Sequence, residues 1–105
     1  MSDEQLTSAL VERAMRWRLA PGRYLKPGGG WTSRSGFRPL VDVRDALQAL
    51  EAVTGDYSIL AKPGEGITVA VRISGLTGKA AGKSKARTIS LALALALGID
   101  PEAGE

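Results

Sequence analysis

The chain has 105 residues, a formal net charge of +3, and neither cysteine nor histidine. This length suits a single domain with a modest hydrophobic core. Without cysteine and histidine, the chain cannot use Ser-His-Asp or Cys-His catalysis, form disulfides or build a cysteine-based zinc site. We therefore expect one domain that is not an enzyme and that needs neither a metal nor a cofactor.

The N-terminal segment 2–18 is predicted to be a helix. Ser2 and Gln5 have the spacing of a capping box, in which each side chain satisfies a free backbone amide. Apolar side chains then recur every three or four residues, as on one face of a helix: Leu6, Leu10, Ala14 and Trp17. Pro21 and Gly22 are expected to end the helix.

Residues 21–40 are rich in glycine and proline, and we expect an irregular loop. Aromatic and basic side chains alternate within it: Arg23, Tyr24, Lys26, Trp31, Arg34, Phe37 and Arg38. Such a pattern can bind nucleic acid, because bases stack on the aromatic rings while cations hold the phosphates. It is also typical of a long connection whose aromatic rings cover one edge of the core.

An α-β-β-α core is predicted over residues 42–98. Its first helix, 42–54, begins at the N-cap residue Asp42 and carries an apolar stripe. A hairpin of two strands, 57–62 and 66–74, should follow, because Pro63-Gly64-Glu65 is a turn signal. The fold class is therefore α+β, with a small antiparallel sheet built on the hairpin 57–74 and layered with two or three helices.

The segment 76–81 can be read as a third strand or as a loop. A final helix is predicted over 84–97, with Ser84 as its cap and Gly98 behind it, followed by a short acidic tail, 99–105. One apolar stripe of this helix should cover the sheet: Ala86, Ile89, Leu93 and Leu97. Leu91 and Leu95 point the other way. They should pack on the first helix, which favours a monomer, or form a homodimer with a second copy.

The stretch from Gly75 to Ser84 resembles a phosphate-binding loop, but Gly78 and Gly82 enclose three residues where a Walker loop has four. Nucleotide hydrolysis is therefore not expected. Basic residues still surround the start of the last helix, where free backbone amides can bind an anion. The candidate anion or nucleic-acid contacts are Lys79, Lys83, Ser84, Lys85 and Arg87.

Parts of the sequence resemble two known protein families. The order helix, hairpin, optional strand and basic helix is similar to that of the double-stranded RNA-binding domain, as is the segment Gly82–Arg87. The second resemblance spans nearly the whole chain. The segment Leu10–Trp17, Trp31 with Phe37–Asp42, and the segment Ala86–Ala94 resemble the phage ABA sandwich domain, a family of small phage and prophage proteins. That resemblance implies a layered α/β arrangement and a phage origin, with no defined activity.

Taken together, the sequence favours a small, soluble phage or prophage accessory or binding domain whose target is unknown. The alternative is a nucleic-acid-binding module that uses the basic segment 79–87. The partner would be a nucleic acid or a phage or host protein. The absence of a long apolar stretch and of a secretory signal pattern predicts a cytoplasmic protein without membrane association.

Overall fold

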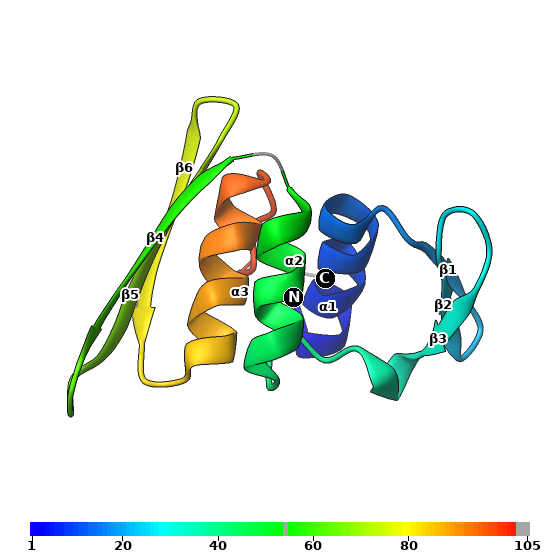
Figure 1. Ribbon diagram of the computed structural model, residues 1–105, viewed down its shortest axis with the longest axis horizontal. Coiled ribbons are helices and arrows are strands. Elements are labelled where there is room, and N and C mark those ends of the chain that lie inside the picture. Colours follow the sequence, from blue (N-terminus) through cyan, green and yellow to red (C-terminus); the bar gives the residue numbers. More distant parts are fainter. Residues whose placement is uncertain (54, 103–105) are drawn as a thin grey trace.

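A computed structural model describes residues 1–53 and 55–102 of the chain (Figure 1). The helices are α1 (Asp3–Leu10), which continues as a π-helical segment (Val11–Met15), α2 (Val43–Ala52) and α3 (Lys85–Ala96), with a short 3-10 turn at Arg34–Gly36. The strands are β1 (Arg18–Ala20), β2 (Arg23–Leu25), β3 (Trp31–Ser33), β4 (Asp56–Lys62), β5 (Gly66–Ile73) and β6 (Leu76–Gly82).

The fold is α+β, as the sequence predicted. Two antiparallel sheets, each of three strands, are present: an N-terminal sheet in the order β1-β2-β3 and a C-terminal sheet in the order β4-β5-β6. The helices lie between these sheets (Figure 1). α3 packs on β5 and β6, and α2 packs on α3. Most of the core is aliphatic and is shared between the helices and the inner face of the C-terminal sheet.

The three predicted helix caps are confirmed. The Ser2 hydroxyl accepts a hydrogen bond from the amide of Gln5, whose side chain accepts one from the amide of Ser2, at 3.1 and 2.8 Å. Asp42 caps α2 and Ser84 caps α3 in the same way. Satisfied amides at a helix start stabilise it, typically by about 1 kcal/mol relative to alanine. The N-termini of α1, α2 and α3 are thus set by local sequence.

The first helix is shorter than predicted. It ends at Met15 and not at residue 18, and its last turn is π-helical. Arg16 then adopts a left-handed conformation, with a φ angle of 60°. The chain therefore leaves the helical path before Trp17, whose ring packs against Phe37 and Tyr24 at centroid distances of 5.0 and 6.3 Å. Tertiary packing of this aromatic cluster accounts for the early end.

The prediction that residues 21–40 are irregular is wrong in part. β2, β3 and the 3-10 turn lie within this range, and β1 precedes it. The strands are only three residues long, so their alternation is too short to stand out among glycines and prolines. The turn between β2 and β3 is closed by a hydrogen bond from the amide of Lys26 to the carbonyl of Gly30 at 3.1 Å.

Residues 76–82 form a third strand, which settles the alternative left open by the sequence. The predicted glycine-rich loop is therefore mostly strand, and its turn lies at Ser74 and Gly75. Gly78 faces α3 so closely that a Cβ atom at this position would collide with backbone atoms of Ala92 and Ala96. Glycine is thus used here for close packing of a helix on a strand, and not for binding phosphate.

The expected packing of the last helix is also corrected. The side of α3 that lies on β6 is that of Ala92 and Ala96, since these residues approach Gly78. Successive side chains are about 100° apart around a helix. Leu93 therefore lies to one side of the contact with β6, and Leu97 points well away from β6. Leu91 is partly buried, while Leu95 lies beside β6 and is 40% exposed. Leu95 therefore does not pack on the first helix as expected.

Ser90 provides a test of the contact between α3 and the loop before α2. Its hydroxyl is buried and donates a hydrogen bond of 2.8 Å to the carbonyl of Pro39. Replacing Ser90 by alanine leaves that carbonyl without its donor, so we expect a loss of about 1–3 kcal/mol in the free energy of unfolding. Urea denaturation would measure it. The exposed Ser58 gives a matched control, and equal losses at both serines would contradict this role.

Candidate nucleic-acid interface

The five residues predicted to contact an anion do not form one surface. Lys79 lies on the outer face of the C-terminal sheet, since its neighbour Gly78 faces α3. Arg87 points toward the start of α1, where its guanidinium pairs with the Asp3 carboxylate at 3.0 Å. This ion pair is largely exposed, so it adds little stability. It nevertheless directs Arg87 away from Lys79.

The other three predicted residues lie at the start of α3. Lys83 and Lys85 are exposed on either side of Ser84. The Ser84 hydroxyl accepts a hydrogen bond of 3.3 Å from the amide of Arg87, so it serves as the helix cap. Two lysines beside a helix start make a small basic spot. They lack the adjoining aromatic ring that would hold a base.

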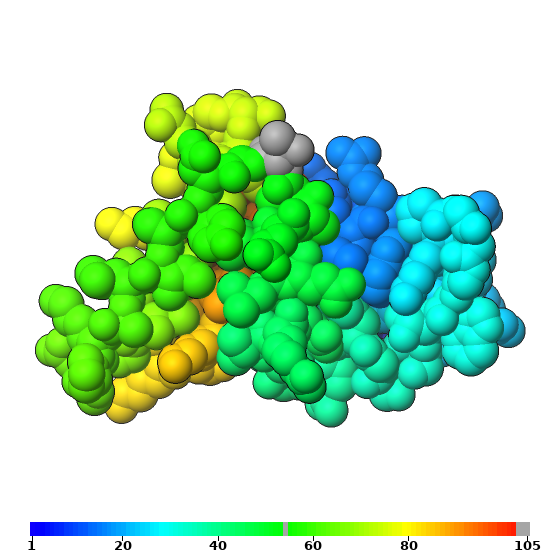
Figure 2. Space-filling view, in the orientation of Figure 1, coloured from blue at the N-terminus to red at the C-terminus, as the bar shows by residue number. Residues whose placement is uncertain are grey.

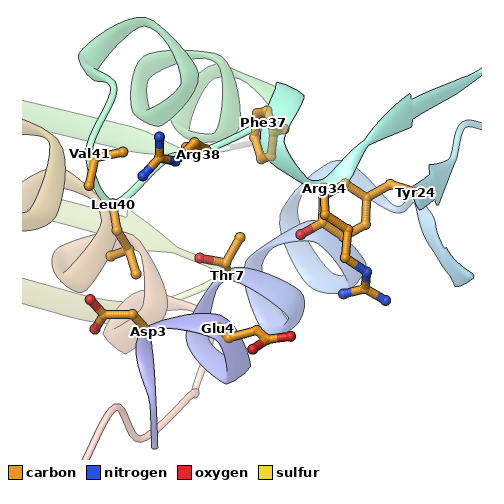
Figure 3. A pocket seen from close by; sticks show the side chains of 9 residues that line it. All are labelled: Asp3, Glu4, Thr7, Tyr24, Arg34, Phe37, Arg38, Leu40 and Val41. Carbon is orange, nitrogen blue, oxygen red and sulfur yellow. The ribbon is translucent and has the colours of Figure 1, made fainter. Parts of the chain in front are cut away.

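A cleft of about 330 Å³ opens between α1 and the 3-10 turn (Figure 3). Its lining carries both signs of charge, with acids from α1 and arginines from the opposite wall: Asp3, Glu4, Arg34 and Arg38. Asp3 is held by Arg87, and the amide of Arg38 donates a hydrogen bond to Asp45 at 2.8 Å. Charges of both signs on facing walls make this cleft a poor site for a polyanion.

The outer face of the N-terminal sheet is different, because it combines an exposed aromatic ring with cations. Tyr24 is buried beneath β2, so strand alternation turns its neighbours Arg23 and Leu25 outward. Strand pairing places Arg18 and Trp31 on either side of Leu25. We call this surface, formed by Arg18, Arg23, Leu25 and Trp31, the Trp31 face.

Trp31 is the aromatic residue of this face, and it is 59% exposed. The guanidinium of Arg23 lies 5.3 Å from the centre of its ring, which is cation–π geometry. That contact orients the indole without burying it. The ring is therefore exposed to solvent in a defined orientation, next to a positive charge.

A cleft of about 590 Å³ adjoins the Trp31 face. Arg16 and Arg18 line one side, and the turn Pro27–Gly30 lines another. The three glycines of this turn have positive φ angles, and a Cβ atom on any of them would meet no neighbour. The turn is therefore open, and its backbone is accessible. Two arginines, an exposed indole and an open turn together suit a phosphate and its base.

Three other basic side chains of this region are engaged in the fold. Arg13 donates to the carbonyl of Leu97 at the end of α3. Lys26 lies 5.3 Å from the ring centre of Trp17, and Arg34 donates to the carbonyl of Ala20 at 3.0 Å. These cations hold the N-terminal sheet and α3 in place. Lys26 and Arg34 belong to the same basic and aromatic segment as Arg23, but their contacts with the fold separate them from it.

Residues 1–53 and 55–102 contain no cluster of three acidic side chains that could hold a metal ion. In the same part of the chain, no helix has both the length and the apolar character needed to cross a bilayer.

Comparison with known proteins shows a structural likeness to a solved structure. No protein-family model matches the chain, and no curated protein matches its sequence. The fold is similar to that of a phage protein from Bacillus cereus ATCC 14579, known from a 2.0 Å crystal structure, with a TM-score of 0.78 and 12% sequence identity. The match covers 97% of this chain and 93% of that one. The two proteins thus share one fold over almost their whole length.

Proposed function

We propose that the chain is a non-enzymatic accessory domain of phage type that binds single-stranded nucleic acid on the Trp31 face. The phage character rests on the fold likeness to the Bacillus cereus phage protein and agrees with the family resemblance of the sequence. A cytoplasmic location is part of the same proposal, since nucleic acid is the ligand. The observation that carries the proposal is the exposed indole of Trp31 flanked by Arg18 and Arg23 on one sheet face.

Base stacking and charge would make separate contributions to binding. Every base has a flat face that can stack on an indole, so Trp31 would bind bases with little sequence preference. Arginines beside it would contact successive phosphates, and binding to about three phosphates of a single strand gives a slope of roughly −2 in a plot of log K against log salt. A duplex hides its bases, so the single strand should bind more tightly.

Replacing Trp31 by alanine should weaken the binding of a fluorescein-labelled dT20 strand by about 1–3 kcal/mol, or roughly 5- to 150-fold. Fluorescence anisotropy at 50 mM salt measures this. Replacing Arg18 by alanine should weaken binding and reduce the magnitude of the salt slope by about 0.7, because one phosphate contact is lost. Both positions are exposed, so the melting temperature should change little.

The matched control is the double change of Lys83 and Lys85 to alanine, which removes the cations at the start of α3. We expect the affinity for dT20 to stay within about twofold, since the attraction of a distant charge is screened over roughly 14 Å at 50 mM salt. Loss of binding in this control, with the Trp31→Ala protein unaffected, would move the site to the segment predicted from sequence. Absence of binding by the wild-type chain would overturn the proposed function.

A further inference from the structure

β4 is an edge strand that no other element of residues 1–53 and 55–102 covers. It pairs with β5 on one side, and all seven of its residues are exposed. Three large apolar side chains lie on it: Tyr57, Ile59 and Leu60, at 46%, 40% and 59% exposure. α3 packs on β5 and β6. Figure 2 shows the side chains of β4 on the molecular surface at the end opposite the N-terminal sheet.

Nothing in β4 protects this edge in the usual ways. Natural edge strands are kept from pairing by proline, bulges, short length or central lysines. The register between β4 and β5 runs without a break from Asp56 opposite Arg72 to Lys62 opposite Gly66. The strand has no proline, and its one lysine is at the end. An unbroken seven-residue edge of this kind is a template for another strand.

The sequence of β4 is complementary to itself in the antiparallel direction. When Ile59 lies opposite Ile59 of a second copy, Asp56 lies opposite Lys62 and Tyr57 opposite Ala61. Both ends of the pair then carry opposite charges, which stabilise cross-strand neighbours. A register shifted to place Asp56 opposite Asp56, or Lys62 opposite Lys62, sets like charges against each other. The charge pattern therefore favours the register centred on Ile59, which also pairs all seven residues of both strands.

The same register also matches the faces of the two sheets. Tyr57, Ile59 and Ala61 pair with Val71, Val69 and Ile67 of β5, so they lie on the inner, apolar face. A two-fold axis perpendicular to the sheet keeps this strip on the inner side in both copies. The apolar side chains of β4 would then cover each other at the junction.

We propose that this chain forms a homodimer by antiparallel pairing of β4 with β4 of a second copy, which makes one six-stranded sheet. β4 and the N-terminal sheet lie at opposite ends of the molecule (Figure 1). The two Trp31 faces therefore stay accessible at the far ends of the dimer. This interface differs from the one through Leu91 and Leu95 considered from sequence, because it uses the free sheet edge.

Sedimentation equilibrium over a concentration series tests the pairing. The wild-type chain should approach twice its 11.0 kDa mass as concentration rises. Asp56→Lys and Lys62→Asp each place like charges at both ends of the paired strands, so each variant should dimerise at least about tenfold more weakly. Mixing the two variants in equal amounts should restore dimers, since every cross-strand pair between them is again opposite in charge.

The double variant Asp56→Lys/Lys62→Asp should also dimerise like the wild type, because it only exchanges the two charges. Melting temperatures of all three variants establish that each is folded. A wild-type chain that stays monomeric at about millimolar concentration, where even weak pairing would show, overturns the proposal. A dimer whose dissociation constant in both single variants is unchanged from that of the wild type overturns it as well, since the contact would then lie elsewhere.

Discussion

Replacing Trp17 by alanine is expected to lower the free energy of unfolding by about 3–5 kcal/mol, the usual cost of truncating a large buried ring. The Trp17 side chain is only 8% exposed and contacts Phe37 at 5.0 Å and Tyr24 at 6.3 Å between ring centres. Lys26 lies over its ring. These contacts join the segment after α1 to the N-terminal sheet and to Phe37, so the change removes one attachment of that sheet.

Urea denaturation followed by far-ultraviolet circular dichroism measures this loss. The matched control is Trp31→Ala, which removes the same side chain from an exposed position. Surface substitutions of this kind stay within about 0.5 kcal/mol. Similar losses for the two tryptophans would show that Trp17 does not hold the aromatic cluster together.

The change Gly78→Ala should destabilise the protein by about 3 kcal/mol, at the upper end of the cost of overpacking a core. A Cβ atom on Gly78 would meet backbone atoms of Ala92 and Ala96 and the side chain of Leu95. Backbone atoms of a helix cannot rotate out of the way as a side chain can. α3 would therefore have to lift from β6, which also loosens its contacts with the buried Val69 and Val71 side of the sheet.

Ala81→Val is the control on the same strand. Ala81 is exposed on the outer face, opposite Thr68, so two extra methyl groups there meet solvent. A β-branched residue also suits a strand, so stability should be unchanged or slightly higher. Thermal unfolding of both variants gives the comparison. A Gly78→Ala protein as stable as Ala81→Val would contradict the close packing of α3 on β6.

The α+β class, the helix starts and the hairpin could be predicted from the sequence because local signals determine them. Ser2, Asp42 and Ser84 cap the helices where capping residues were expected. The predicted strand 66–74 is present as β5, whose inner side chains Ile67, Val69 and Val71 are buried. Two predicted segments reach beyond the described residues: the second helix at residue 54 and the acidic tail at residues 103–105.

Tertiary packing decided the features that were not predicted. The helix that ends before Trp17 does so because the indole turns into an aromatic cluster formed by residues far along the chain. The strand character of residues 76–82 depends on pairing with β5 and on the approach of α3 to Gly78. Neither contact leaves a periodic signal in the sequence.

The sequence predicted residues of the candidate site but not how they are arranged in space. Trp31 and Arg23 were both noted as members of an aromatic and basic segment. Their position on one outer face depends on the register of three short strands, with Leu25 opposite Trp31. The segment 79–87 is the stronger candidate from sequence because four cations lie close together along the chain. Strand alternation and the ion pair with Asp3 then separate Lys79 from Arg87.

The emission of Trp31 during titration with dT20 tests the proposed function most directly. A base stacked on the indole should quench its fluorescence in parallel with binding, while the buried Trp17 gives a constant background. The change Trp31→Phe keeps a ring for stacking, so this variant should still bind dT20 but show almost no quenching. If the strand binds while the emission of Trp31 stays constant, or if it does not bind at low salt, the Trp31 face is not a nucleic-acid site.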